Sequence, residues 1–195
     1  MTLFGKLFAS SMAPRREWGG DSSTGWVNTQ AGEHVSSETA MKLSAVFGCI
    51  RLISDDVKVL PCGVFRREEK KRTSMSGHPV DDLISWRPNP DMDIASFRQA
   101  MQAMVDLRGN SYAEIQRNGY GDPVGLWPLD ADRMEVKVEN GTLTYKYRDG
   151  MTPKVIPVDR VFHVKGMTLD GYTGLSVLQY ARETFGAGLA IAKTG

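Results

Sequence analysis

The sequence contains few of the residues that catalysis or a disulfide scaffold would use. Cys49 and Cys62 are its only cysteines, with no C-x-x-C spacing, which indicates a reducing compartment and no zinc site. The three histidines, His34, His78 and His163, lie far apart. No phosphate-binding G-x-x-x-x-G-K-[ST], H-E-x-x-H or G-x-S-x-G pattern occurs. We therefore predict no catalytic residue, no cofactor and no metal ion, and expect that the protein is not an enzyme.

Excess charge of one sign and long apolar runs are also absent. The 24 basic and 23 acidic residues leave a net charge of +1, which disfavours simple DNA binding and attraction to anionic lipid. No run approaches the roughly 18 apolar residues of a membrane span. The N-terminal segment has Lys6 inside a short apolar run, unlike a secretory signal. We expect a soluble protein without a membrane partner, and its 195 residues suffice for one domain with a core.

The stretch from Trp86 to Arg117 carries the strongest structural signal. Asp93 is a good N-cap and Gly109 lies where a left-handed C-terminal cap is usual. Between them, apolar residues recur at the spacing of a helix face: Ile94, Phe97, Ala100, Met101, Met104 and Leu107. Ser111 to Arg117 then alternates apolar and polar residues, which predicts a strand with one buried face.

The rest of the chain completes an α+β pattern. Residues 10–37 are poor in apolar residues, and we predict a flexible arm over residues 1–37. Its Trp18 and Trp26 either anchor it on a neighbouring subunit, or pack on their own domain or stay loose. Helices are predicted over Glu38–Lys58 and Val80–Trp86. Strands in an antiparallel meander are predicted from residue 111 to residue 165, with turns at Asn140-Gly141 and Asp149-Gly150. We expect N-terminal helices packed on this meander over residues 38–173.

Residues Gly174 to Gly195 predict a long helix, with Leu175, Leu178, Ala181, Phe185 and Leu189 on one side. No capping residue closes this helix. We therefore expect the parent protein to continue beyond it.

Three groups of residues are candidate sites. The run Arg66 to Arg72 has a net charge of +3, because Arg66, Arg67, Lys70, Lys71 and Arg72 outnumber Glu68 and Glu69. It indicates a solvated hairpin tip more than a phosphate site. Cys49 with His163 could form a nucleophile set, but Cys49 lies next to Ile50, which is in the apolar stripe of the helix predicted over Glu38–Lys58, and this favours a small buried apolar residue. The pairs Asp55-Asp56, Asp81-Asp82 and Asp130/Asp132 could bind a divalent ion, yet helix ends and turns favour acids at these places.

Several stretches, in order, resemble the portal proteins of tailed bacteriophages of the lambdoid, long-tailed type. They are ETAMKLSAVFGCIRLISDDVKVLPCGVF, HPVDDLISWRPNP, FRQAMQAMVDLRGNSYAEIQR, GLWPLDADRMEV and VFHVKGMTLDGYTGLSVLQYAR, within Glu38 to Lys193. The resemblance implies that residues 38–173 form most of the N-terminal part of a portal wing domain. Residues 174–195 would then begin a helix toward stem and clip regions that this chain lacks.

The resemblance also implies a mechanical function. Family members form a dodecameric ring at one vertex of the capsid, and double-stranded DNA is packaged and ejected through it without sequence-specific binding. The ring is a platform for the terminase large subunit, capsid or scaffold proteins and head-completion proteins. The implied location is the virion, with assembly in the host cytoplasm. The alternative is a minor-capsid or head-assembly binding module that does not conduct DNA.

Overall fold

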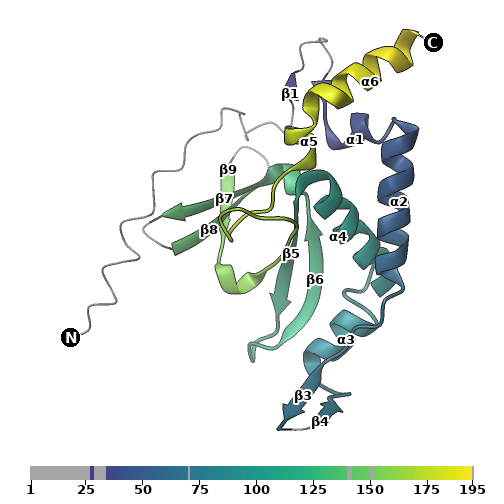
Figure 1. Ribbon diagram of the computed structural model, residues 1–195. Helices are drawn as coiled ribbons and strands as arrows, with labels where there is room; N and C mark the ends of the chain where they lie inside the picture. Colours follow the sequence, from purple (N-terminus) through teal and green to yellow (C-terminus); the bar gives the residue numbers. More distant parts are fainter. Residues whose placement is uncertain (1–26, 29–33, 70, 140–141, 150–151, 195) are drawn as a thin grey trace, which may run out of the picture.

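The computed structural model describes residues 27–28, 34–69, 71–139, 142–149 and 152–194. Figure 1 shows the elements arranged around a central helix, α4. The helices are α1 (Ser37–Ala40), α2 (Ser44–Lys58), α3 (Pro79–Ser85), α4 (Ile94–Arg108), α5 (Val177–Tyr180) and α6 (Arg182–Thr194), with short 3-10 helices η2 (Ala131–Arg133) and η3 (Val158–Arg160). The strands are β1 (Val27–Asn28), β2 (His34–Val35), β3 (Phe65–Glu68), β4 (Lys71–Ser74), β5 (Asn110–Arg117), β6 (Pro123–Leu129), β7 (Met134–Glu139), β8 (Thr142–Asp149), β9 (Thr152–Ile156) and β10 (Val161–Lys165).

The caps predicted for α4 are confirmed. The carboxylate of Asp93 accepts a hydrogen bond from the Ser96 amide at 2.8 Å, and Gly109 has a φ of 71° in the left-handed region. The helix packs Phe97 and Met101 toward the sheet, and α2 lies along its other side (Figure 1). The polar side of α4 is therefore also an interface, where Gln99 donates a hydrogen bond to Asp55 of α2 at 2.6 Å.

Six of the strands form two antiparallel three-stranded sheets instead of one meander, while β1 pairs with β2 and β3 with β4 in two-stranded sheets. One sheet has the order β10-β5-β6 and the other β7-β8-β9. The last strand of the chain, β10, pairs with β5, so Val161 lies opposite Glu114. A cluster of Tyr112, Tyr145, Ile156 and Val161 fills the space between the sheets. The predicted turn at Asn140-Gly141 and the residue Gly150 lie outside the described ranges, although β7 pairs with β8 and β8 with β9 as hairpins require.

Two predicted helices are broken in the structure. The helix expected over Glu38–Lys58 is split into α1 and α2, because Leu43 has an extended backbone with a φ of −77° and a ψ of 117°. The break lets Ala40 become fully buried while α2 turns to lie along α4. The helix expected from Gly174 starts only at Val177 and is interrupted at Ala181. In both cases tertiary packing overrides a helical pattern.

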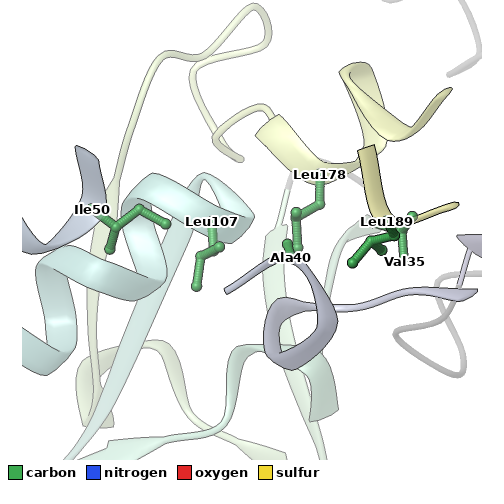
Figure 2. Close-up of a cluster of buried hydrophobic side chains, with 6 residues drawn as sticks. All are labelled: Val35, Ala40, Ile50, Leu107, Leu178 and Leu189. Carbon is green, nitrogen blue, oxygen red and sulfur yellow. The ribbon is translucent and has the colours of Figure 1, made fainter. Parts of the chain in front are cut away.

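The segments on either side of these two helix breaks contribute to a second part of the hydrophobic core. Figure 2 shows its buried side chains, which are Val35, Ala40, Ile50, Leu107, Leu178 and Leu189. Val35 is only 1% exposed, although it lies in the predicted arm. Ser36 then caps α1, accepting a hydrogen bond from the Thr39 amide at 3.1 Å. The division of the chain into arm, domain and terminal helix remains a prediction, but the packed structure begins before residue 38.

Candidate interaction surfaces

His163 lies in a structural hydrogen-bond network between the two sheets. Its Nδ1 is 3.1 Å from the Tyr145 hydroxyl, and its Nε2 is 3.0 Å from Oδ1 of Asn110. The Asn110 oxygen is an acceptor, so Nε2 carries the proton and Nδ1 accepts from Tyr145. Cys49 is exposed on α2, so the prediction that it is buried is wrong. Both ring nitrogens of His163 are thus engaged by groups other than the proposed nucleophile, and the hydrolase alternative has no support in this geometry.

Burial of His163 predicts a dependence of stability on acid pH. Burial, with a smaller contribution from the charge of Lys165, lowers the pKa of His163 from 6.5 to about 4. Between these values the unfolded chain binds a proton that the folded protein does not, so the free energy of unfolding falls as the pH drops. We expect the protonation of this group to lower the free energy of unfolding by roughly 1 to 3 kcal/mol. This range is below the full value of the pKa difference, because the ring is partly exposed to solvent.

His163→Gln should flatten this decline in urea unfolding curves measured from neutral pH to about pH 4. His78→Gln, which removes an imidazole from the exposed start of α3, should keep it. An unchanged slope in His163→Gln would show that other groups cause the acid destabilisation.

At least one carboxylate of each predicted pair is engaged in local structure. Asp130 caps η2 by accepting from the Asp132 amide at 2.9 Å, while Asp132 forms an ion pair with Arg108 at 2.5 Å. Asp55 pairs with Lys58, also at 2.5 Å, and the hydrogen bond from Lys58 lowers the pKa of that carboxyl. Asp81 accepts a hydrogen bond from the Val64 amide at 2.7 Å. Within the described part of the chain, no group of three or more His, Cys, Asp or Glu residues is arranged to hold a metal ion.

A hollow lies at one end of the β10-β5-β6 sheet. It has a volume of about 420 Å³ and is lined by Glu114, Ile115, Gln116, Arg117, Trp127 and Arg160. Its polar side chains bond to neighbours in the chain: Glu114 pairs with Lys154 at 3.2 Å, and Trp127 donates to Gln116 at 2.9 Å. Because these lining side chains already bond to other residues of the chain, we assign no ligand to this hollow.

The predicted basic run forms the hairpin β3–β4, at the end of the molecule away from α6 (Figure 1). Every residue of both strands is exposed. Arg67 lies directly opposite Arg72, and Glu68 lies opposite Lys71. Lys70, Trp18 and Trp26, also predicted as interaction residues, lie outside the described ranges. We call residues 65–74 the basic hairpin.

A second surface was missed by the sequence reasoning. The side of α2 that faces away from α4 carries exposed apolar side chains, with Leu52 65% exposed and Val59 just beyond the helix 71% exposed. Ala45 and Cys49 precede them at helical spacing and are also exposed. We call these four residues the outer α2 face. The sequence could have indicated this surface, because α2 has apolar residues on two sides. This pattern is typical of a helix whose two sides are both covered by other parts of a protein.

In the described part of the chain, the helices are all too short or too polar to cross a membrane.

Comparison with known proteins supplies the biological context of these surfaces. The family described as Phage portal protein matches residues 44–195. The portal protein of Enterobacteria phage HK97 is 32% identical over 161 residues, which cover 81% of this chain and 37% of that protein. The probable portal protein of Streptomyces phage phiC31 is 28% identical over 184 residues, covering 85% of this chain and 38% of its own length.

A solved structure shares the fold. A chain in the neck of an empty gene transfer agent (GTA) particle aligns with a TM-score of 0.66 and 26% identity, over 81% of this chain and 45% of its own. The present chain thus spans less than half the length of each of these relatives.

Proposed function

Because the chain belongs to the phage portal protein family, we propose that it forms part of the wing of a ring at the portal vertex of a capsid. The family match over residues 44–195 is the observation that carries this proposal. In this role double-stranded DNA passes through the ring during packaging and ejection. The terminase large subunit, capsid or scaffold proteins and head-completion proteins dock on it. The ring would assemble in the host cytoplasm and remain in the virion.

The outer α2 face is the surface that we assign to contact between ring subunits. A closed ring of identical subunits requires two different patches on each subunit, one at each side of the joint. Leu52 on α2 and Val59 just beyond its end present apolar area to solvent, which is the kind of surface that subunit contacts cover. The near-neutral charge of the chain is compatible with a conduit, since many tight phosphate contacts would slow moving DNA.

Mass measurement tests the proposal. The polypeptide that contains this chain, in the length that its gene encodes, should form a closed ring whose mass is a fixed multiple of the subunit, with twelve copies as the family resemblance implies. A strict monomer over a wide concentration range would favour the head-assembly module that conducts no DNA.

The double variant Leu52→Asp/Val59→Asp should remove the ring from the mass distribution without unfolding the subunit. Both side chains are already exposed, so we expect the free energy of unfolding to change by less than roughly 0.5 kcal/mol per site. A charge on each subunit at an apolar joint should instead prevent association. Tyr120→Asp, at a position 95% exposed in the turn between β5 and β6, is the control and should assemble normally. Normal rings from the double variant would place the joint elsewhere.

A further inference from the structure

The basic hairpin has little contact with the rest of the fold. It is a sheet of only two strands, and all eight strand residues are exposed. Figure 1 shows it beyond α3, at the edge of the molecule. Isolated two-stranded hairpins are marginally stable in water, so a hairpin in this position gains most from a partner that covers it.

The strand register separates the charges of the basic run onto two faces. Side chains directly opposite one another in an antiparallel pair share a face, and successive residues alternate between faces. One face carries Phe65, Arg67, Arg72 and Ser74, and we call it the arginine face. The other, the mixed face, carries Arg66, Glu68, Lys71 and Thr73.

The two faces differ in charge balance. On the mixed face Glu68 lies opposite Lys71, so opposite charges meet across the strands. On the arginine face Arg67 lies opposite Arg72, an arrangement of like charges that destabilises a sheet. Within the described ranges, neither arginine side chain has an ion pair or hydrogen bond. Among its four strand residues, the arginine face therefore has two positive charges and no acid.

The chemistry of this face fits a carboxylate donor. A guanidinium group binds a carboxylate through two parallel hydrogen bonds, and two adjacent guanidinium groups can hold neighbouring acids. A hollow of about 180 Å³ lies at the hairpin tip, lined by Arg67 and Arg72 together with Glu68, Glu69 and Lys71. Phe65, 59% exposed, lies on the same face beside Arg67. Aromatic and arginine side chains are both enriched at protein–protein interfaces.

Nucleic acid fits the same surface less well. Two uncompensated cations would neutralise only about two phosphates, whereas firm duplex binding uses several. We propose that the arginine face is a docking site for an acidic segment of another protein, with Arg67 and Arg72 holding its carboxylates and Phe65 packing beside them. This site lies on a different surface from the proposed ring joint and does not depend on it.

Labelled octaglutamate is the probe for this docking site. The purified chain should bind it at physiological ionic strength, measured by fluorescence anisotropy. Arg67→Gln/Arg72→Gln should weaken binding by roughly tenfold or more, because both bidentate donors are lost. Arg66→Gln/Lys71→Gln removes the same amount of charge from the mixed face and should weaken binding by less than about threefold, through long-range charge alone.

Three outcomes would overturn the proposal. They are absence of octaglutamate binding, equal weakening by the two double variants, and tighter binding of a short DNA duplex that is lost in Arg67→Gln/Arg72→Gln. Thermal unfolding separates docking from folding. Arg67→Gln/Arg72→Gln should be at least as stable as the wild type, since it removes a repulsive cross-strand pair.

Discussion

Gly174→Ala should destabilise the protein by roughly 3 to 5 kcal/mol, among the largest effects expected for one methyl group. A β-carbon at this position would lie 1.8 Å from the carbonyl oxygen of Gly109 and 2.8 Å from its carbonyl carbon. Both obstructing atoms belong to the backbone, so no side-chain rotation can relieve the overlap. The chain after β10 must move away from the end of α4 to make room.

Three glycines make this crossing possible, and we call Gly109, Gly166 and Gly174 the glycine crossing. The Gly166 amide donates to the Gly109 carbonyl at 2.8 Å. The side chain of Asn110 accepts from the Gly174 amide at 2.7 Å and donates to the Gly174 carbonyl at 2.8 Å. Displacing Gly174 would break these bonds, and would also weaken the support that Asn110 gives to His163.

Urea unfolding of Gly174→Ala and Gly48→Ala, followed by circular dichroism, measures the effect. Gly48 lies within α2, and a β-carbon there would have no atom within 4 Å. Alanine at that position should stabilise the protein by roughly 0.5 to 1 kcal/mol, because it favours the helix. If Gly174→Ala unfolds at the same urea concentration as the wild type, the close crossing does not exist in solution.

The contrast between these glycines shows which parts of the fold the sequence can predict. Gly109 was predicted as a helix cap, because a cap depends on residues close together in the chain. Its contact with Gly174 depends on how α4, β10 and the last segment meet in space. No local pattern marks Gly174 as a point of close backbone contact, and the sequence placed it at the start of a predicted helix.

The two helix breaks likewise depend on contacts between elements that are distant in the chain, and not on local sequence. The helix predicted over Glu38–Lys58 covers the two helices α1 and α2, but the interruption at Leu43 that separates them contains neither glycine nor proline. It arises because α1 and α2 pack against different elements. The periodicity of a segment reports that it has an apolar side and does not report what covers that side. The exposed outer α2 face was missed for this reason.

The candidate surface was predicted only in part. The composition of the basic run indicated a charged hairpin tip, and the structure places its described residues on β3, β4 and the turn. The sum of the charges could not distinguish Arg67 and Arg72 from Arg66 and Lys71. Only the register, with Arg67 opposite Arg72, separates an unbalanced face from a balanced one.

Arg108→Met should destabilise the protein by roughly 2 to 3 kcal/mol, because it leaves a partly buried carboxylate without its counter-charge. The Arg108 side chain is only 10% exposed and lies 2.5 Å from Asp132. It also donates a hydrogen bond to the Ser37 hydroxyl at 2.8 Å, so it joins the end of α4 to η2 and to the start of α1. Methionine can fill part of the same space, but it has no donor for either partner.

The pH dependence identifies the cause of this loss. Burial raises the pKa of Asp132 above 3.8, and Arg108 acts in the opposite direction. Without Arg108 this pKa should rise further. A carboxyl whose pKa is higher in the folded protein than in the unfolded chain favours folding only at acid pH, where it is protonated. This stabilisation is lost as the pH rises through the pKa of the folded state. The deficit of Arg108→Met relative to the wild type should therefore be smaller near pH 4 than at pH 7.

Two further variants complete the experiment, with unfolding by urea as the measurement. Adding Asp132→Asn to Arg108→Met should recover part of the lost stability, since it removes the unpaired charge. Arg51→Met is the matched control, because Arg51 is 68% exposed and lies 3.5 Å from Asp55. A solvent-exposed pair of this kind contributes little, so we expect less than about 0.5 kcal/mol. Equal losses in Arg51→Met and Arg108→Met would mean that the buried ion pair does not hold α1, α4 and η2 together.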